Sequence, residues 1–116
     1  MKFEYVLLAH LGIGPLIAFI GWLFKKYPPK EINMFYGYRT SRAMKNLANW
    51  NFANRHSAKT FLQLGIATTV VQLLAAVITT TYHAIMIGCV VLVIGLIACM
   101  WSTEQKLKQF ENDQLE

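Results

Sequence analysis

At 116 residues the chain allows one domain. Hydrophobic residues make up 55% of it and charged residues 15%, against about 45–50% and 25% in typical soluble domains. Because so short a chain cannot cover several wholly apolar helices with polar faces, the composition argues against an ordinary soluble bundle.

Two stretches without a formal charge are long enough to cross a membrane. Tyr5–Phe24 has 20 residues and Thr60–Thr103 has 44. A helix needs about 20 apolar residues to cross the hydrocarbon core, so the longer stretch corresponds to two crossings. The polar run Thr79–His83 divides it. We therefore predict one all-α domain over residues 1–116, an integral membrane three-helix bundle with spans at about 5–24, 61–81 and 84–101.

The segment between the first two spans, residues 25–59, is strongly basic. It holds eight of the eleven Lys and Arg residues and one acid, Glu31. With Lys106 and Lys108 in the tail at 102–116, ten basic residues fall on one side of the spans and only Lys2 on the other. Basic residues accumulate on the cytoplasmic side of membrane proteins. We therefore expect the N-terminus outside, and the loop and the C-terminus in the cytoplasm.

Within this loop the sequence predicts an interfacial helix that leads into the second span. Pro28 and Pro29 end the first helix and favour an extended connector. Thr40 or Ser41 is a suitable N-cap, so the helix should begin near Ser41. One face of it would carry Ala43, Leu47, Trp50, Asn54 and Ser57, and the opposite, basic face Lys45, Phe52, Arg55 and Lys59.

The helix face that carries Trp50 and Asn54 continues along the second span through Thr68, Gln72 and Thr79. Polar and small residues in membrane helices usually face other helices, so we predict that this stripe is the seam of the bundle and that Gln72 bonds to a neighbouring helix. In the third span Gly88 and Gly95 share a close-packing face. This face is compatible with packing within one chain or between copies in a homo-oligomer.

Residues suited to catalysis do not converge. The spans contain no acid, and His10 and His83 are predicted at the outer end while His56 is at the inner end. There is no Cys/His cluster with metal-ligand spacing and no glycine-rich phosphate loop. We therefore expect a protein that is not an enzyme, with no cofactor and no metal site.

The remaining candidate residues gather in the loop and the helix that follows it: Asn33, Tyr36, Gly37, Tyr38, Arg39, Thr40, Trp50 and Asn54. Arg39 could clamp a phosphate or carboxylate in bidentate fashion. It could equally bond loop carbonyls and hold the loop against the bundle. Arg39, Arg42 and Lys45 together could bind lipid phosphate. A ligand site and a structural clasp are both open interpretations of this motif.

The order of these residues resembles the signature of the SdpI family of bacterial membrane proteins, in a short three-helix form. The matching pattern is Asn33-x-x-Tyr36-Gly37-Tyr38-Arg39-Thr40, followed by Ser41, Asn46, Trp50 and Ala53-Asn54. In that family the signature lies between the first and second helices of a three-helix unit. The name-giving member, which has additional N-terminal membrane helices, protects a bacterium against a membrane-killing peptide toxin that is secreted during starvation. It also draws a transcriptional repressor to the membrane.

The resemblance implies a protein of the bacterial cytoplasmic (inner) membrane that gives immunity to a peptide toxin by binding or sequestering it. The alternative is a small membrane scaffold or signalling adaptor whose basic loop recruits a cytoplasmic transcriptional regulator. A subunit of a small-molecule exporter is a third option, which the acid-free spans disfavour. The expected partners are thus the lipid bilayer with a toxin or a regulator. Direct nucleic acid binding is not expected, because membrane topology accounts for the +5 charge.

Overall fold

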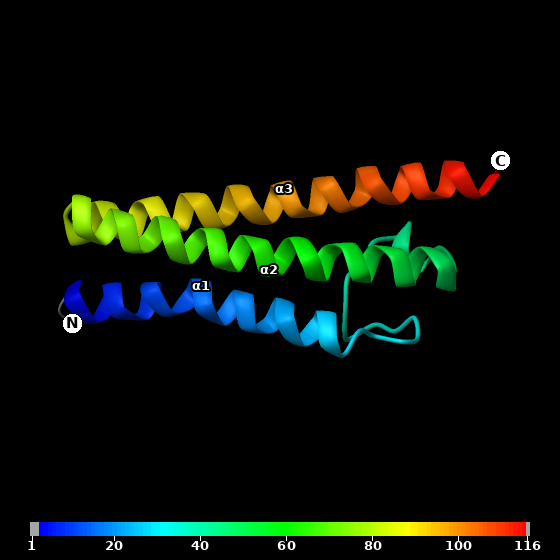
Figure 1. Ribbon diagram of the computed structural model, residues 1–116, viewed down its shortest axis with the longest axis horizontal. Coiled ribbons are helices and arrows are strands. Elements are labelled where there is room, and N and C mark those ends of the chain that lie inside the picture. Colours follow the sequence, from blue (N-terminus) through cyan, green and yellow to red (C-terminus); the bar gives the residue numbers. More distant parts are fainter. Residues whose placement is uncertain (1–2, 116) are drawn as a thin grey trace.

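Three long helices form an elongated bundle in the computed structural model, which describes residues 3–115. The elements are α1 (Phe3–Lys26), the short 3-10 helix η1 (Ala43–Lys45), α2 (Leu47–Ile78) and α3 (Thr81–Leu115), and no strand occurs among the described residues. Figure 1 shows the three long helices running side by side. The start of α1 and the α2–α3 turn lie at one end, the turn end. Residues 27–46 and the last part of α3 lie at the other, the loop end.

All three long helices are long and apolar enough to cross a membrane. The predicted all-α, multi-pass membrane architecture is therefore confirmed. The helices α2 and α3 have 32 and 35 residues, which at 1.5 Å per residue gives about 50 Å each. The hydrocarbon core is only about 30 Å thick. Because their charged residues are gathered toward the loop end, α2 and α3 extend beyond the membrane there.

The helix that leads into the second span begins later than predicted. It starts at Leu47, not near Ser41, because Asn46 adopts an extended conformation (φ −157°) and its side-chain oxygen accepts a hydrogen bond from the Asn49 nitrogen at 2.7 Å. Thr40 instead lies in the turn that precedes η1, where its hydroxyl accepts a hydrogen bond from the Ala43 nitrogen at 3.2 Å. From Leu47 the helix continues unbroken into the span, as predicted, and keeps one direction along the bundle (Figure 1).

The chain reverses between α2 and α3 at Thr79 and Thr80, inside the polar run where the turn is predicted. Thr79 is the C-cap of α2, and its backbone nitrogen donates to the Ala75 oxygen at 2.9 Å. The tail after Trp101 is helical as far as Leu115, so α3 continues well past the predicted third span.

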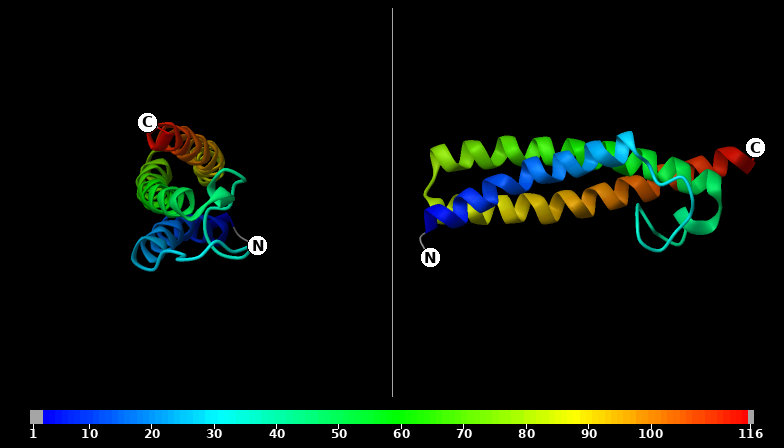
Figure 2. Two further views of the ribbon diagram at one scale, coloured as in Figure 1. Left: turned by 90° about the vertical axis from the view of Figure 1, so that its right-hand side faces the viewer. Right: turned by 90° about the horizontal axis from the view of Figure 1, so that it is seen from below.

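Close contact between the long helices depends on glycines. A Cβ atom at Gly65 of α2 would lie 2.2 Å from the backbone nitrogen of Ala18 in α1, so the two backbones nearly touch. On α3, Gly88 faces Gln72 and Gly95 faces Leu64. The predicted glycine face of α3 therefore packs within the chain. The helix α2 is the central element, packed against both α1 and α3, which contact each other little. The left view of Figure 2, along the bundle, shows α2 between α1 and α3.

Candidate functional site

The tip of the loop is folded by the side chain of Asn33. Its oxygen accepts hydrogen bonds from the backbone nitrogens of Phe35 and Tyr36 at 2.9 and 2.7 Å, and its amide nitrogen donates to the Glu31 oxygen at 2.9 Å. This pattern is an Asx turn, for which asparagine is well suited. Asn33 thus has a local structural partner for each of its polar atoms.

Two further motif residues tie the tip to its surroundings. The Tyr36 hydroxyl donates to the Tyr27 backbone oxygen, and the Tyr36 ring meets Phe24 edge to face at 4.9 Å. The Arg39 guanidinium donates to the Met34 backbone oxygen. Since the described contacts of Arg39 are with the loop itself, the structure matches the second of the two roles considered for it, a bond to a loop carbonyl.

Asn54 and Trp50 of α2 hold the base of the loop. The Asn54 oxygen accepts from the Tyr38 nitrogen at 2.6 Å, and its amide donates to the oxygens of Trp50 and Tyr38 at 2.9 and 3.4 Å. The fully buried Trp50 donates from Nε1 to the Pro29 oxygen at 2.9 Å. The loop is therefore fixed to α2 at two points, at Pro29 near its start and at Tyr38 in its second half.

Gly37 is required at the point where the loop meets Asn54. It has φ of +109°, a conformation that residues with a side chain rarely adopt. A Cβ atom there would also lie 2.5 Å from the Asn54 side-chain oxygen and 2.7 Å from Pro29 Cγ. Conformation and space thus both explain why glycine occupies this position of the motif.

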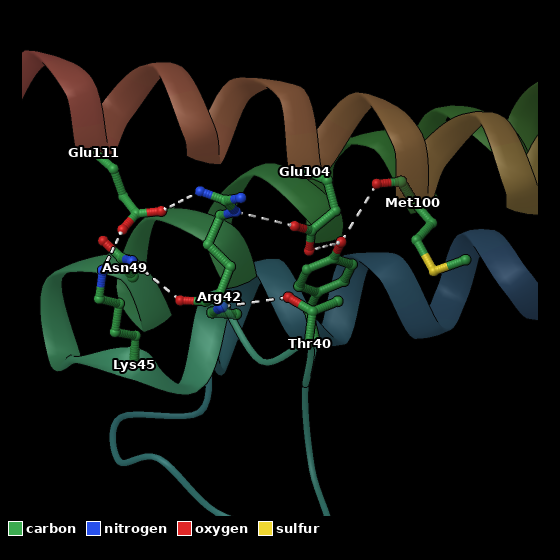
Figure 3. A network of polar contacts seen from close by, with 9 residues as sticks. Thr40, Arg42, Lys45, Asn49, Met100, Glu104 and Glu111 are labelled. Atoms are coloured by element: carbon green, nitrogen blue, oxygen red, sulfur yellow. Dashed lines mark hydrogen bonds and ion pairs between the residues drawn. The ribbon is translucent and has the colours of Figure 1, made fainter.

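A polar network joins the loop to α3 (Figure 3). The Tyr38 hydroxyl donates to Glu104 Oε1 at 2.7 Å. Arg42 pairs with Glu111 at 2.7 Å and with Glu104 at 3.6 Å, and Lys45 pairs with Glu111 at 3.2 Å. Of the three cations considered for lipid phosphate, Arg42 and Lys45 are thus ion-paired with carboxylates of α3, while Arg39 donates to the Met34 oxygen.

The network fixes the protonation of its members. Burial, reinforced by the Glu104 carboxylate, raises the pKa of Tyr38, so its hydroxyl keeps the proton that it donates. The hydrogen bond from Arg42, followed by that from Lys45, lowers the pKa of Glu111, so this carboxylate is charged at neutral pH. Charge-assisted hydrogen bonds of this kind are stronger than neutral ones.

Beneath the network lies a small apolar core that is separate from the packing of the spans. Ala43 of η1, Ala53 of α2 and Leu107 of α3 are completely buried, and the rings of Phe52 and Phe110 stack at 4.5 Å. The contribution of α3 to this core was not predicted from the sequence. The spacing of Thr103, Leu107 and Phe110 at i, i+4 and i+7 is the signal that marks an apolar stripe in this mixed-charge tail.

The predicted seam is present in part. Thr68 and Gln72 are buried, and the Gln72 amide donates to the Ala84 oxygen of α3 at 3.1 Å, which is the interhelical bond expected of it. Thr79 does not share this position, because it is exposed at the end of α2. Leu47, predicted on the same inward face, is likewise half exposed. The Thr68 hydroxyl has no hydrogen-bond partner within the described chain.

An apolar groove of about 330 Å³ lies between α2 and α3, next to the loop end. Tyr38 lines it on the loop side. Its walls are formed by Ser57, Thr60, Phe61, Leu96, Ile97, Cys99, Met100 and Thr103. In addition, within residues 3–115 no group of three or more His, Cys, Asp or Glu side chains is placed to hold a metal ion.

The sequence of this chain is similar to those of known proteins. The profile of the SdpI/YfhL protein family matches residues 30–102, which include the loop motif, all of α2 and most of α3. The chain belongs to the SdpI/YfhL protein family. It is 33% identical over 101 residues to the uncharacterized protein YfhL of Bacillus subtilis (strain 168), covering 87% of each chain. No solved structure matches it. The family predicted from the loop motif is thereby confirmed.

Proposed function

We propose that this protein protects a bacterium against a membrane-active peptide toxin by binding the toxin within the bilayer, without catalysis. Membership of the SdpI/YfhL family supports this function, since immunity is the role that the resemblance to its name-giving member implies. The observation that carries the mechanism is the apolar groove between α2 and α3. An amphipathic peptide helix binds proteins by laying its apolar side into a groove of this kind.

In this proposal the loop motif is a clasp and not the toxin site. Its asparagine and tryptophan side chains are occupied by hydrogen bonds to loop or helix backbone. Tyr38 links the clasp to the groove, because its backbone bonds to Asn54 and it also lines the groove. The clasp would thus set the shape of the groove at its loop end.

We further propose that the protein lies in the bacterial cytoplasmic membrane with its N-terminus outside. Ten of the eleven Lys and Arg residues lie in the loop or the tail, and the positive-inside rule places them in the cytoplasm. Labelling of single introduced cysteines in intact cells would test this orientation. A cysteine at Thr80 should react with an impermeant reagent and one at Gln109 should not, after removal of the two native cysteines.

The proposed function is tested by survival of a sensitive bacterium that expresses the protein while it is challenged with the starvation toxin of the name-giving member. Ile97 lines the groove and is 59% exposed, whereas Ile94, also on α3, is 61% exposed and lies outside it. Filling the groove with Ile97→Trp should reduce protection, and the matched Ile94→Trp should not. Arg39→Ala should also protect, because Arg39 bonds only to a loop carbonyl among the described contacts.

These variants are compared at equal membrane levels. If the natural sequence gives no protection, immunity to this toxin is wrong for this protein. If the two tryptophan variants protect equally, the groove is not the toxin site, although immunity itself stands.

A signalling adaptor is the second candidate, and the exposed loop tip favours it. Phe35 is 93% exposed and Met34 66% exposed, outside the apolar spans. A soluble regulator would then dock on this tip, since Arg42 and Lys45 are already ion-paired. The adaptor predicts no protection in a foreign host. It also predicts a cytoplasmic regulator that co-purifies with the natural protein and is lost with Phe35→Ser.

A further inference from the structure

A second cavity at the loop end has a different chemistry from the groove. It lies between the last turn of α1, the Pro28–Pro29 connector and the first turns of α2, and its volume is about 370 Å³. Phe24 and the two prolines form an apolar wall. The polar wall includes Lys25, Lys30 and Arg55. The volume lies within the roughly 300–1,000 Å³ that is typical of small-molecule sites.

Among the described residues, no carboxylate balances the positive charges around this cavity. Its lining contains three cations and no carboxylate. The ion pairs found in the described chain involve Arg42 and Lys45, and none involves the lining residues. Cations that converge without a counter-charge repel one another, and an anion between them relieves this repulsion. The cavity is therefore electrostatically suited to an anion.

The family motif holds the wall of the cavity in place. Trp50 donates to the Pro29 oxygen at 2.9 Å, and Gly37 allows the loop to approach Pro29 closely. Asn54, which lines the cavity, is fixed by its bonds to Tyr38 and Trp50. A binding site whose walls are held in this way loses little entropy when a ligand enters.

The cavity also lies where lipid headgroups are expected. The apolar span of α1 ends at Lys26, and the exposed Trp22 and Tyr27 flank this end. Lys26 Nζ lies 5.0 Å from the centre of the Trp22 ring and 5.6 Å from that of Tyr27. Tryptophan, tyrosine and lysine gather at the membrane–water interface. The cavity is therefore at the depth of the phosphate groups of the adjoining leaflet.

We propose that this cavity binds the phosphate group of an anionic phospholipid. Arg55 offers a planar guanidinium that can contact two phosphate oxygens, while Lys25 and Lys30 supply point charges. Phe24 and the prolines contact the start of the lipid's apolar part. The site differs from the sequence-based cluster of Arg39, Arg42 and Lys45, and it does not depend on the protein's role in immunity.

The proposal is tested with the full chain in detergent micelles, by native mass spectrometry of bound phosphatidylglycerol and phosphatidylcholine. The triple variant Lys25→Gln, Lys30→Gln, Arg55→Gln removes the three cations. The control Lys59→Gln, Lys106→Gln, Lys108→Gln removes the same charge from positions outside the cavity. We expect the cavity variant to lose affinity for phosphatidylglycerol about tenfold more than the control, the effect of losing at least one charged hydrogen bond.

Equal losses in the two triple variants would overturn the proposal, because general surface attraction would then explain lipid binding. So would unchanged binding in both. Retention of inorganic phosphate by the natural protein, without retention of phosphatidylglycerol, would reject the lipid as ligand in favour of a free anion. If the triple variant does not fold, the single variants Lys30→Gln and Arg55→Gln decide, and each should show a smaller loss in the same direction.

Discussion

The spans and the loop end of this bundle are held together by different interactions. Within the spans, Gly14, Gly21 and Gly65 bring the backbones of α1 and α2 into contact, and the Gln72 amide reaches the backbone of α3. At the loop end, side-chain hydrogen bonds and ion pairs join the loop to α2 and to α3. Helices in lipid gain no hydrophobic attraction for one another, so they depend on close packing.

This contrast predicts that the largest loss of stability comes from a small change in the spans. A Cβ atom at Gly65 would lie 2.2 Å from the Ala18 nitrogen and 2.6 Å from its Cα, and neither backbone atom can move without the whole helix. Gly65→Ala should therefore lower the free energy of unfolding by about 3 kcal/mol, the upper part of the usual range for overpacking. Unfolding by SDS in mixed micelles measures this quantity.

The matched control is Gly12→Ala on α1, where a Cβ atom would meet nothing within 4 Å. It should leave stability unchanged or slightly raise it, since alanine is the better helix former. A similar loss in both variants would mean that close packing of α1 against α2 does not explain the effect, because Gly12 has no such contact.

At the loop end, the largest effect should come from Asn54. Asn54→Ala removes the acceptor of the Tyr38 nitrogen and two donated bonds from a side chain that is 4% exposed. Leaving a partly buried amide without a partner costs about 1–3 kcal/mol. Hydrogen exchange should show faster exchange at Tyr38, with the spans unchanged.

The control for this position is Asn51→Ala, one turn away and exposed on the same helix. It should leave exchange at Tyr38 unaltered. If Asn51→Ala releases the loop as much as Asn54→Ala does, the hydrogen bonds of Asn54 are not what holds it.

Sequence reasoning predicts the spans well because their signal is continuous. Long charge-free stretches and a polar break locate the three helices, and the loop motif locates the family. The start of α2 is less predictable, since Thr40, Ser41 and Asn46 are all suitable caps. In the structure Thr40 accepts a hydrogen bond from the Ala43 nitrogen ahead of η1, and Asn46 caps α2.

The contacts of the candidate site are harder to predict from the sequence than the spans are. Its motif residues are identified by local pattern, but their partners Glu104 and Glu111 are 66 and 69 residues from the side chains that they bind. A mixed-charge tail gives no sign of which loop cations it neutralises. The same pairing leaves Lys25, Lys30 and Arg55 as the unpaired cations around the second cavity, which no spacing in the sequence reveals.

A smaller effect is expected from the bond between the loop and α3. Tyr38→Phe keeps the aromatic ring of this groove-lining residue and removes the hydroxyl that donates to Glu104 at 2.7 Å. Loss of one such bond costs about 1 kcal/mol. The difference should be measurable by SDS unfolding, and limited proteolysis should cut the loop faster. If Glu104→Gln combined with Tyr38→Phe is no worse than Tyr38→Phe alone, the hydroxyl acts mainly through Glu104.

The smallest effect is a dependence on pH that comes from Glu111. Its pKa is lowered from the ordinary value of 4.5, chiefly by the hydrogen bond from Arg42. A carboxylate with a depressed pKa stabilises the fold above its unfolded pKa, and this contribution is lost as the pH falls through the folded value. The loop should therefore exchange hydrogen faster relative to the spans as the pH falls below 4.5, after correction for the intrinsic rate. Glu111→Gln should show the weaker attachment already at pH 7 and lose the dependence. A natural protein whose loop is equally protected on both sides of this range would show that ion pairing to α3 contributes nothing to the clasp, and that hydrogen bonds to α2 alone hold it.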